Sequence, residues 1–237
     1  MELQGKTAFV TGVTRGIGQA IAQELHRRGA RVIGTGTTSR ANVDNLHRYV
    51  AADFSTREGI EACAATLAEE SPDILVNNAG INKIAPFAQI ALDDFLLIQT
   101  VNVTAPFVLC QAAVKSMSAK GWGRIVNISS IWGKISKSQR ASYSATKFAI
   151  DGLTVALALE YAGQGVLANC VAPGFTDTEL TRKVLGEAQI AELVQMVPAK
   201  RMAKVEEVAQ LVVWLASPQN SYVTGQNIAI DGGFTRA

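Results

Sequence analysis

Residues 7–18 read Thr-Ala-Phe-Val-Thr-Gly-Val-Thr-Arg-Gly-Ile-Gly, and this stretch decides the fold. Its apolar beginning, residues 7–10, is typical of a short buried parallel strand. A helix is expected from Gln19 to Arg28, because apolar residues recur along one face and Gly29 follows as a stop signal. Residues 31–35 are apolar again and predict a second strand. A glycine-rich turn between a strand and a helix is the setting in which such a turn binds a nucleotide.

The glycine-rich turn has what a dinucleotide pyrophosphate needs. Glycine permits positive φ and close approach of the backbone to a phosphate, and the helix N-terminus offers free N–H groups with a partial positive charge. The spacing is Gly-x-x-x-Gly-x-Gly instead of Gly-x-Gly-x-x-Gly. A tight turn without any ligand is the alternative. The predicted cofactor-binding residues of the turn are Gly12, Thr14, Arg15, Gly16, Ile17 and Gly18.

The end of the second strand indicates which dinucleotide is bound. An NAD site usually has an acidic residue about 20 residues beyond the glycines. Residues 34–40 instead read Gly-Thr-Gly-Thr-Thr-Ser-Arg, so that Thr37, further hydroxyls and Arg40 stand there, and Arg15 could reach the same phosphate. A 2′-phosphate needs donors and positive charge, so the sequence predicts NADP(H), with NAD(H) as the alternative. Both arginines could instead be solvated surface residues.

Two more strand ends provide candidate cofactor contacts. A third strand is expected over residues 48–53, and Asp53 at its end could accept a hydrogen bond from the adenine amino group, with Phe54 beside it. A helix N-cap nearby is the alternative. A fourth strand over residues 74–76 runs into the sequence Asn-Asn-Ala-Gly at residues 77–80. We predict that Asn78, Ala79 and Gly80 line the ligand crevice, although the same residues suit an ordinary turn.

The second half of the chain carries a candidate proton donor. Tyr143 and Lys147 stand four residues apart in an expected helix, so the phenol and the ammonium group point the same way. A cation nearby favours a phenolate, which suits proton exchange near neutral pH. A surface tyrosine on a lysine stem is the alternative. A strand over residues 123–128 ends at Ser129 and Ser130, two rival hydroxyls.

These motifs occur together in one order: Thr-Gly-x-x-x-Gly-Ile-Gly at 11–18, Asn-Asn-Ala-Gly at 77–80, Asn102, Ser130, Tyr143-x-x-x-Lys147 and Pro173-Gly174. The set resembles the short-chain dehydrogenase/reductase family over essentially the whole chain. Within the family it is most similar to bacterial 3-oxoacyl-[acyl-carrier-protein] reductases. The resemblance implies a single-domain Rossmann-type α/β fold over residues 1–237: a doubly wound parallel sheet of about seven strands with helices on both faces. The nucleotide half would span about 1–120 and the catalytic half about 121–237.

The resemblance also implies residue roles. Tyr143 would protonate the carbonyl oxygen as hydride arrives, and Ser130 would hydrogen-bond the same oxygen. Lys147 would favour the ionised phenol and hold the nicotinamide ribose, while Asn102 would anchor a water that links Lys147 to solvent. Trp132 joins Ser130 and Tyr143 as a substrate-binding residue. Further cofactor contacts would come from Pro173, Gly174, Phe175 and Thr176, with Tyr143 and Lys147.

The expected activity is NADPH-dependent reduction of a carbonyl to a secondary alcohol, similar to 3-oxoacyl-[acyl-carrier-protein] reductases. Acyl-carrier protein would meet basic residues, and Lys120 lies near one such place, but Gln164 stands where an arginine would be expected. A polar or sugar-derived ketone or alcohol is therefore the alternative, with Lys83, Phe87 and Lys134 as further pocket residues. A non-catalytic nucleotide-binding protein is a third hypothesis.

Composition limits the other classes. The chain has 237 residues, 48% hydrophobic, with a net charge of +2, which gives no reason to expect a nucleic-acid surface. Its three cysteines are odd in number and widely spaced, so neither a disulfide framework nor a metal site is expected. No apolar run of about 18 residues stands out, so no membrane association is expected. We expect a cytoplasmic protein and, by resemblance, a homotetramer.

Overall fold

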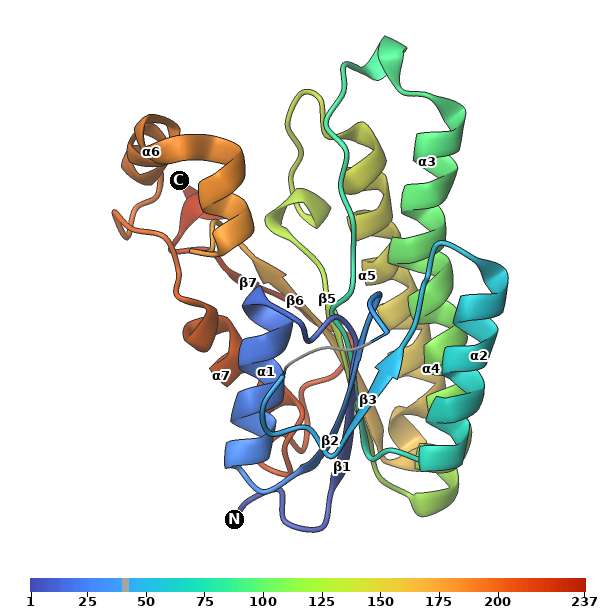
Figure 1. Ribbon diagram of the computed structural model, residues 1–237. Helices are drawn as coiled ribbons and strands as arrows, with labels where there is room; N and C mark the ends of the chain where they lie inside the picture. The colour runs from blue at the N-terminus through green and yellow to red at the C-terminus, as the bar shows by residue number, and fades with distance from the viewer. Residues whose placement is uncertain (40–42) are drawn as a thin grey trace.

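The computed structural model describes residues 1–39 and 43–237, which form one seven-stranded sheet with helices on both faces (Figure 1). The strands are β1 (Thr7–Val10), β2 (Arg31–Gly36), β3 (Arg48–Ala51), β4 (Ile74–Asn77), β5 (Gly123–Ile128), β6 (Val166–Pro173) and β7 (Asn227–Ile230). Their order is β3-β2-β1-β4-β5-β6-β7, with every neighbouring pair parallel. This confirms the expected fold. The strand order reverses between β1 and β4, the point at which open α/β sheets bind ligands.

The helices divide between the two faces of the sheet. They are α1 (Gly16–Arg27), α2 (Arg57–Glu70), α3 (Leu92–Gln99), α4 (Ala105–Lys120), α5 (Ala141–Tyr161), α6 (Glu179–Met196) and α7 (Val205–Leu215). Helices α1 and α7 cover one face, and α2, α4 and α5 cover the other (Figure 1). Each face buries its own apolar cluster, around Ile21 and Val213 on one side and Phe9 and Leu109 on the other.

Helices α3 and α4 are joined through the π-helical turn η2 (Thr100–Thr104) into one continuous helix. A break near residues 104–106 was expected, and the irregular turn lies just before it. By length and composition alone this helix, Leu92–Lys120, could cross a membrane, with a mean hydropathy of 1.5 and 39% of its apolar window buried. The helix is not an unbroken apolar run, because polar residues such as Gln99 and Asn102 interrupt it, so it does not contradict the expectation of no apolar run of about 18 residues. Its buried side packs on α2, α5 and the sheet, as in a core helix.

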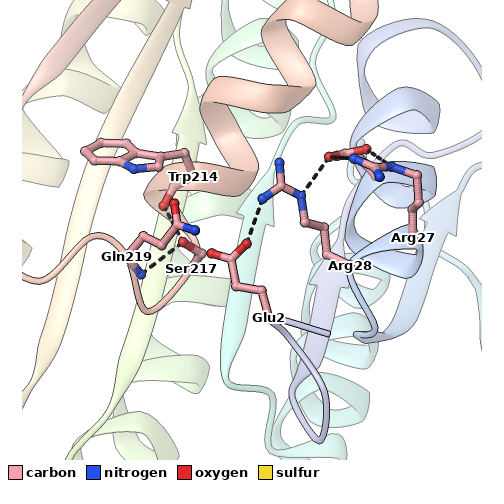
Figure 2. Close-up of polar contacts among 7 residues, drawn as sticks. Glu2, Arg27, Arg28, Trp214, Ser217 and Gln219 are labelled. Carbon is pink, nitrogen blue, oxygen red and sulfur yellow. Dashed lines mark hydrogen bonds and ion pairs between the residues drawn. The ribbon is translucent and has the colours of Figure 1, made fainter.

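The beginning of the chain is fastened beside the ends of α1 and α7 (Figure 2). Leu3 is fully buried, and Arg28 forms an ion pair with Glu2 at 2.6 Å. At the end of α7 the hydroxyl of Ser217 donates to the carbonyl of Trp214 and accepts from the N–H of Gln219. These contacts hold the edge of the sheet at which the strands begin. The opposite edge is left to the loops that follow the strands.

Candidate active site

The glycine-rich turn lies between β1 and α1 and is fastened to the end of β4. The hydroxyl of Thr11 accepts hydrogen bonds from the N–H groups of Asn78 (2.9 Å) and Ala79 (3.0 Å). The amide of Asn78 donates back to the carbonyls of Thr11 and Gly12, both at 3.0 Å. The Asn-Asn-Ala-Gly run is therefore part of the turn's framework, which its sequence alone did not distinguish from an ordinary turn.

Glycine is required at the narrowest point of this turn. A Cβ placed on Gly18 would lie 2.1 Å from the carbonyl oxygen of Gly12. Gly12 and Gly16 have φ of +72° and +59°. The residues of the first turn of α1, Gly16 to Gln19, include no acid, and Arg15 before them makes no side-chain cap. Exposed donors at an acid-free helix N-terminus fit an anionic pyrophosphate.

A second helix begins beside the same turn. Thr178, the N-cap of α6, lies so close to Gly16 that a Cβ there would be 3.7 Å from its methyl group. Thr176 is buried and bridges to Ala203, which holds the segment after β6 in place. Helix α6 is bent at Gly186, where the backbone leaves the helical region. The segment after β6 thus continues into a bent helix whose N-cap residue reaches the glycine-rich turn.

The remaining cofactor candidates lie around the ends of β2 and β3. Thr14, Arg15 and Thr37 are exposed there, while Arg40 lies outside the described residues. Asp53 is exposed, and hydrogen bonds from the Ser55 hydroxyl and from the Ser55 N–H, the latter at 2.9 Å, hold the pKa of this carboxyl below its usual value. The side chain of Phe54 is only 6% exposed and belongs to the core. Phe54 therefore offers a cofactor its main chain and not its ring.

The helix cap expected near Asp53 is also present. Thr56 caps α2 by accepting from the N–H of Gly59 at 3.1 Å. The two interpretations of this segment are compatible, because the cap uses Thr56 and leaves the exposed carboxylate of Asp53 at the surface.

Tyr143 and Lys147 lie one turn apart on α5, as their spacing predicted. The Nζ atom of Lys147 is 5.4 Å from the centre of the Tyr143 ring. Lys147 is 5% exposed, and its ammonium group donates to the carbonyl of Ile128 at 2.7 Å. This bond fixes the lysine against the end of β5. Within the described part of the chain the Tyr143 hydroxyl has no hydrogen-bond partner, so it is available to a ligand.

The two serines after β5 make different hydrogen bonds. Ser129 is buried and its hydroxyl donates to the main-chain carbonyl of Lys147 at 3.2 Å. Ser130 instead accepts from the N–H of Trp132 at 3.2 Å. Its hydroxyl proton has no acceptor among the described residues and can be donated to a ligand oxygen. The geometry therefore favours Ser130 over its neighbour, as the spacing to Tyr143 did.

Asn102 lies in the π-helical turn and is 2% exposed. Its amide donates to the carbonyl of Ile81 at 2.9 Å and to the hydroxyl of Thr146 at 3.1 Å, and it accepts from the N–H of Ile81 at 2.8 Å. All these bonds bind protein groups, so the side chain is a clamp between three segments. π-helical turns inside α-helices are frequent at functional sites.

An aromatic cluster stands beside these residues, and sequence reasoning found only part of it. Trp132 and Phe175 meet edge to face at 6.3 Å, and Phe234 lies 4.9 Å from Phe175 and 6.3 Å from Trp132. Phe234 was missed. The signal that could have found it is Asp231-Gly232-Gly233, because Asp231 turns the chain back by accepting from Gly233 and Thr235.

Gly174 makes room for that turn. A Cβ on Gly174 would lie 2.8 Å from the Cα of Asp231, and its N–H donates to the carbonyl of Ile230 at 2.9 Å. Pro173 before it is buried at the end of β6. The Pro173-Gly174 segment thus lies directly against the end of β7.

Five other residues are candidates for contact with the substrate or its carrier, and four of them have structural partners. Lys134 donates to the carbonyl of Asn227 at 2.7 Å, and Lys83 forms an ion pair with Asp94. Phe87 is 81% exposed. Lys120 pairs with Asp73 at 3.3 Å and lies, like Gln164, before the beginnings of β5 and β6. That edge is opposite the one that carries Ser130, so neither residue lies at the mouth of this site within one chain.

Comparison with known proteins places the fold and site in a family. A family profile described as enoyl-(acyl carrier protein) reductase matches residues 12–235. The 3-oxoacyl-[acyl-carrier-protein] reductase FabG of Vibrio cholerae is 39% identical over 98% of both chains. A structure described as an NAD(P)-dependent gluconate 5-dehydrogenase from Beutenbergia cavernae, with bound NADP, has a TM-score of 0.93 at 39% identity, covering 100% of this chain and 99% of its own. A gluconate 5-dehydrogenase from Burkholderia cenocepacia, in complex with NADP and tartrate, has a TM-score of 0.92 at 32% identity, covering 100% and 97%.

The fold and these comparisons define the class of the protein as an NAD(P)-dependent oxidoreductase. The chain belongs to the short-chain dehydrogenase/reductase family, and it is an NAD(P)-dependent enzyme of that family.

Proposed function

We propose that the protein reduces a ketone to a secondary alcohol with NADPH, and that 3-oxoacyl thioesters are its first candidate substrates. The observation that carries this proposal is the convergence of two available hydroxyls, those of Tyr143 and Ser130, beside the buried ammonium group of Lys147. All three lie at the carboxyl edge of the sheet, next to the glycine-rich turn. When bound, the nicotinamide cofactor supplies the hydride.

Each side chain then has a definite task. Ser130 donates its proton to the carbonyl oxygen and orients it, and Tyr143 transfers its proton to the same oxygen. The ammonium group of Lys147 donates one N–H to the carbonyl of Ile128. Its other N–H groups are available to the nicotinamide ribose and to the space beside Tyr143. Asn102 holds η2 in the shape that leaves a main-chain carbonyl for water, through which protons return from solvent.

The preference for NADPH rests on charge at the end of β2. The chain there continues as Thr37-Thr38-Ser39 with no acid, and Arg15 projects from the glycine-rich turn nearby. Positive charge and hydroxyl donors favour a 2′-phosphate, whereas an acid would favour the free ribose hydroxyl. The NADP bound to the two solved gluconate dehydrogenases supports the same choice.

A second candidate substrate is a polyhydroxy ketone or its alcohol. The positions of Lys120 and Gln164 favour this substrate over an acyl carrier. Lys120 pairs with Asp73, and Gln164 contacts Ser118, both at the edge of the sheet opposite the site. Within one chain these residues provide no basic surface for an acidic carrier at the site. The relatives described as gluconate dehydrogenases, one with bound tartrate, act on or bind compounds of this polar kind.

The function is tested by following NADPH absorbance with acetoacetyl-CoA, methyl acetoacetate and 5-keto-D-gluconate. We expect turnover of at least one ketone, and its loss in Tyr143→Phe, while NADPH fluorescence titration shows unchanged cofactor affinity. Lys183→Gln, on the exposed part of α6, is a control that should keep full activity. If Tyr143→Phe turned over the ketone at the wild-type rate, the proposed role of the phenol would be wrong.

We also propose that four chains assemble through α3, α4 and α5. Large apolar side chains are exposed along these helices, among them Leu96 (51%), Phe107 (44%), Phe148 (48%) and Leu159 (81%). Many large apolar side chains exposed on neighbouring helices favour an interface. Light scattering should give four chains for the wild type and fewer for Leu159→Glu; a monomeric wild type would refute the assembly.

We propose a cytoplasmic location as well. Cys63, Cys110 and Cys170 are free and buried, which fits the reducing cytoplasm.

A further inference from the structure

Among the described arginines whose side chains are at least half-buried, Arg140 differs from the others in its lack of partners. It is half-buried, yet its guanidinium has neither an ion pair nor a hydrogen bond within the described residues. Arg28 is half-buried too, but pairs with Glu2 and Glu24, and buried Arg124 donates to three main-chain carbonyls. Withdrawing a cation from water without a partner costs free energy, which an anionic ligand would recover.

The chain on either side of Arg140 carries positive charges and no acid. Its loop, residues 131–140, contains three cations and no acid, and the first turn of α5 contains no acid either. Arg140 is the residue before α5, where a positive charge meets the positive end of the helix dipole. Lys134 is bound to the carbonyl of Asn227 and Lys137 is exposed, so Arg140 is the cation of this loop that is both half-buried and unpaired among the described residues.

Arg140 is three residues before Tyr143, and its carbonyl accepts a hydrogen bond from the N–H of Ser144 at 2.7 Å, so both residues lie at the first turn of α5. Burial lowers the pKa of its guanidinium, and the electrostatic interaction with Tyr143 raises it in part. The hydroxyl of Tyr143 lacks a partner as well within the described chain. An anion on Arg140 would therefore sit beside the group that Tyr143 protonates, and a substrate that carries both would be held at two points.

We propose that Arg140 binds a carboxylate of the substrate, so that the preferred substrate is a ketone bearing a carboxylate in the same small molecule. This inference rests on the proposed reductase function and selects the second of its substrate candidates. A planar guanidinium matches a carboxylate in a bidentate arrangement that a lysine ammonium cannot reproduce. Arg140 is in this proposal a substrate-binding residue, while Tyr143 and Ser130 act on the ketone.

The experiment compares charged and neutral ketones in wild type, Arg140→Gln and Arg140→Lys. The pairs are acetoacetate with methyl acetoacetate, and 5-keto-D-gluconate with D-fructose. For the charged ketones, Arg140→Gln should raise KM about 10- to 100-fold with little change in kcat, because a charge-assisted pair is lost. Arg140→Lys should recover part of that loss. For the neutral ketones KM should change less than about threefold, and Lys137→Gln should behave as wild type.

A binding measurement separates this inference from the proposed function. In the Tyr143→Phe background, L-tartrate should raise the unfolding temperature of the NADPH complex, and Arg140→Gln should remove that shift. Preference of the wild type for acetoacetyl-CoA over every keto acid by tenfold or more would overturn the inference and leave the reductase function standing. Equal effects of Arg140→Gln on charged and neutral ketones would also overturn it. The substrate preference of the wild type decides the matter even if the variants fold poorly.

Discussion

Asn102 and Ile81 exchange two hydrogen bonds, one in each direction, at 2.9 and 2.8 Å. The pair joins the segment after β4 to the π-helical turn η2. Gly80 lies next to it, and a Cβ there would be 3.3 Å from Oδ1 of Asn102 and 3.8 Å from Nζ of Lys147. The clamp therefore fixes the main chain beside the ammonium group of Lys147.

Asn102→Ala should lower both stability and turnover. It leaves the N–H and C=O of Ile81 without their partners, which should cost about 1–3 kcal/mol in urea unfolding. Turnover should fall at the same time, since η2 loses its fixed shape. Thr146→Val is the matched control, because it removes one partner of Asn102 at 3.1 Å and keeps the Ile81 pair. A wild-type urea midpoint for Asn102→Ala would contradict the clamp.

The adjacent serines should separate stability from catalysis. Ser130→Ala should reduce kcat by about 10²- to 10³-fold, as for the loss of an oxyanion donor, with NADPH affinity retained. Ser129→Ala should lose about 1 kcal/mol of stability, because its hydroxyl supports the Lys147 carbonyl, and keep most of its activity. Steady-state kinetics and urea unfolding of both variants check this. The reverse pattern would exchange their roles.

Gly18→Ala should damage the nucleotide turn itself. The added Cβ would meet the Gly12 carbonyl oxygen at 2.1 Å and Nδ2 of Asn78 at 2.3 Å, so main chain must move. We expect a loss of about 1–3 kcal/mol, as for overpacking, and weaker NADPH binding by fluorescence titration. Gly163→Ala has no atom within 4 Å of the new Cβ and should be neutral or stabilising. Unchanged NADPH affinity in Gly18→Ala would argue against a pyrophosphate at this turn.

Arg15→Ala should change cofactor preference. Its loss should weaken NADPH about tenfold, the effect of one charge-assisted contact, and leave NADH nearly unchanged. Arg27→Ala, which removes an exposed arginine paired with Glu24 at the far end of α1, is the control. Dissociation constants of both cofactors provide the measurement. Equal weakening of NADH and NADPH would assign Arg15 to the shared pyrophosphate instead of the 2′-phosphate.

Asp231 should make stability depend on acid pH. Burial acts to raise its pKa, but hydrogen bonds from the hydroxyl and N–H of Thr235 and the N–H of Gly233 outweigh it and lower the pKa. A depressed folded pKa gives stability that is present above the unfolded value of about 3.9 and is lost as pH falls through the folded value. Asp231→Asn should therefore unfold at lower temperature than wild type at pH 7, with the gap closing toward pH 3. A gap that widens in acid would refute this sign.

Local patterns predicted the fold because each strand and helix signal is read within a few residues. The spacing of Tyr143 and Lys147 is likewise set by one helix turn, so their alignment on α5 could be predicted. The start of α1 at Gly16 instead of Gln19 depends on the tight turn before it. No local pattern revealed the core position of the Phe54 ring, because that depends on packing against the helices beyond the sheet.

The missed features are contacts between distant segments. Phe234 reaches Trp132 and Phe175 only because Asp231 turns the chain after β7. Lys134 was predicted to face substrate, yet it is bound by Asn227, 93 residues away. Arg140 is likewise unpaired among the described residues because the fold places no acidic side chain within reach of it. Partners of this kind become visible only in three dimensions.

The aromatic cluster gives the molecule an optical probe of its own site. Trp132 lies beside Phe175, whereas Trp122 is covered by Lys6 and Arg124, and Trp214 ends α7 near the start of the chain. Replacing the latter two with phenylalanine would leave a single indole whose emission reports occupancy directly. Ligand arrival could then be timed in a stopped-flow instrument without any label.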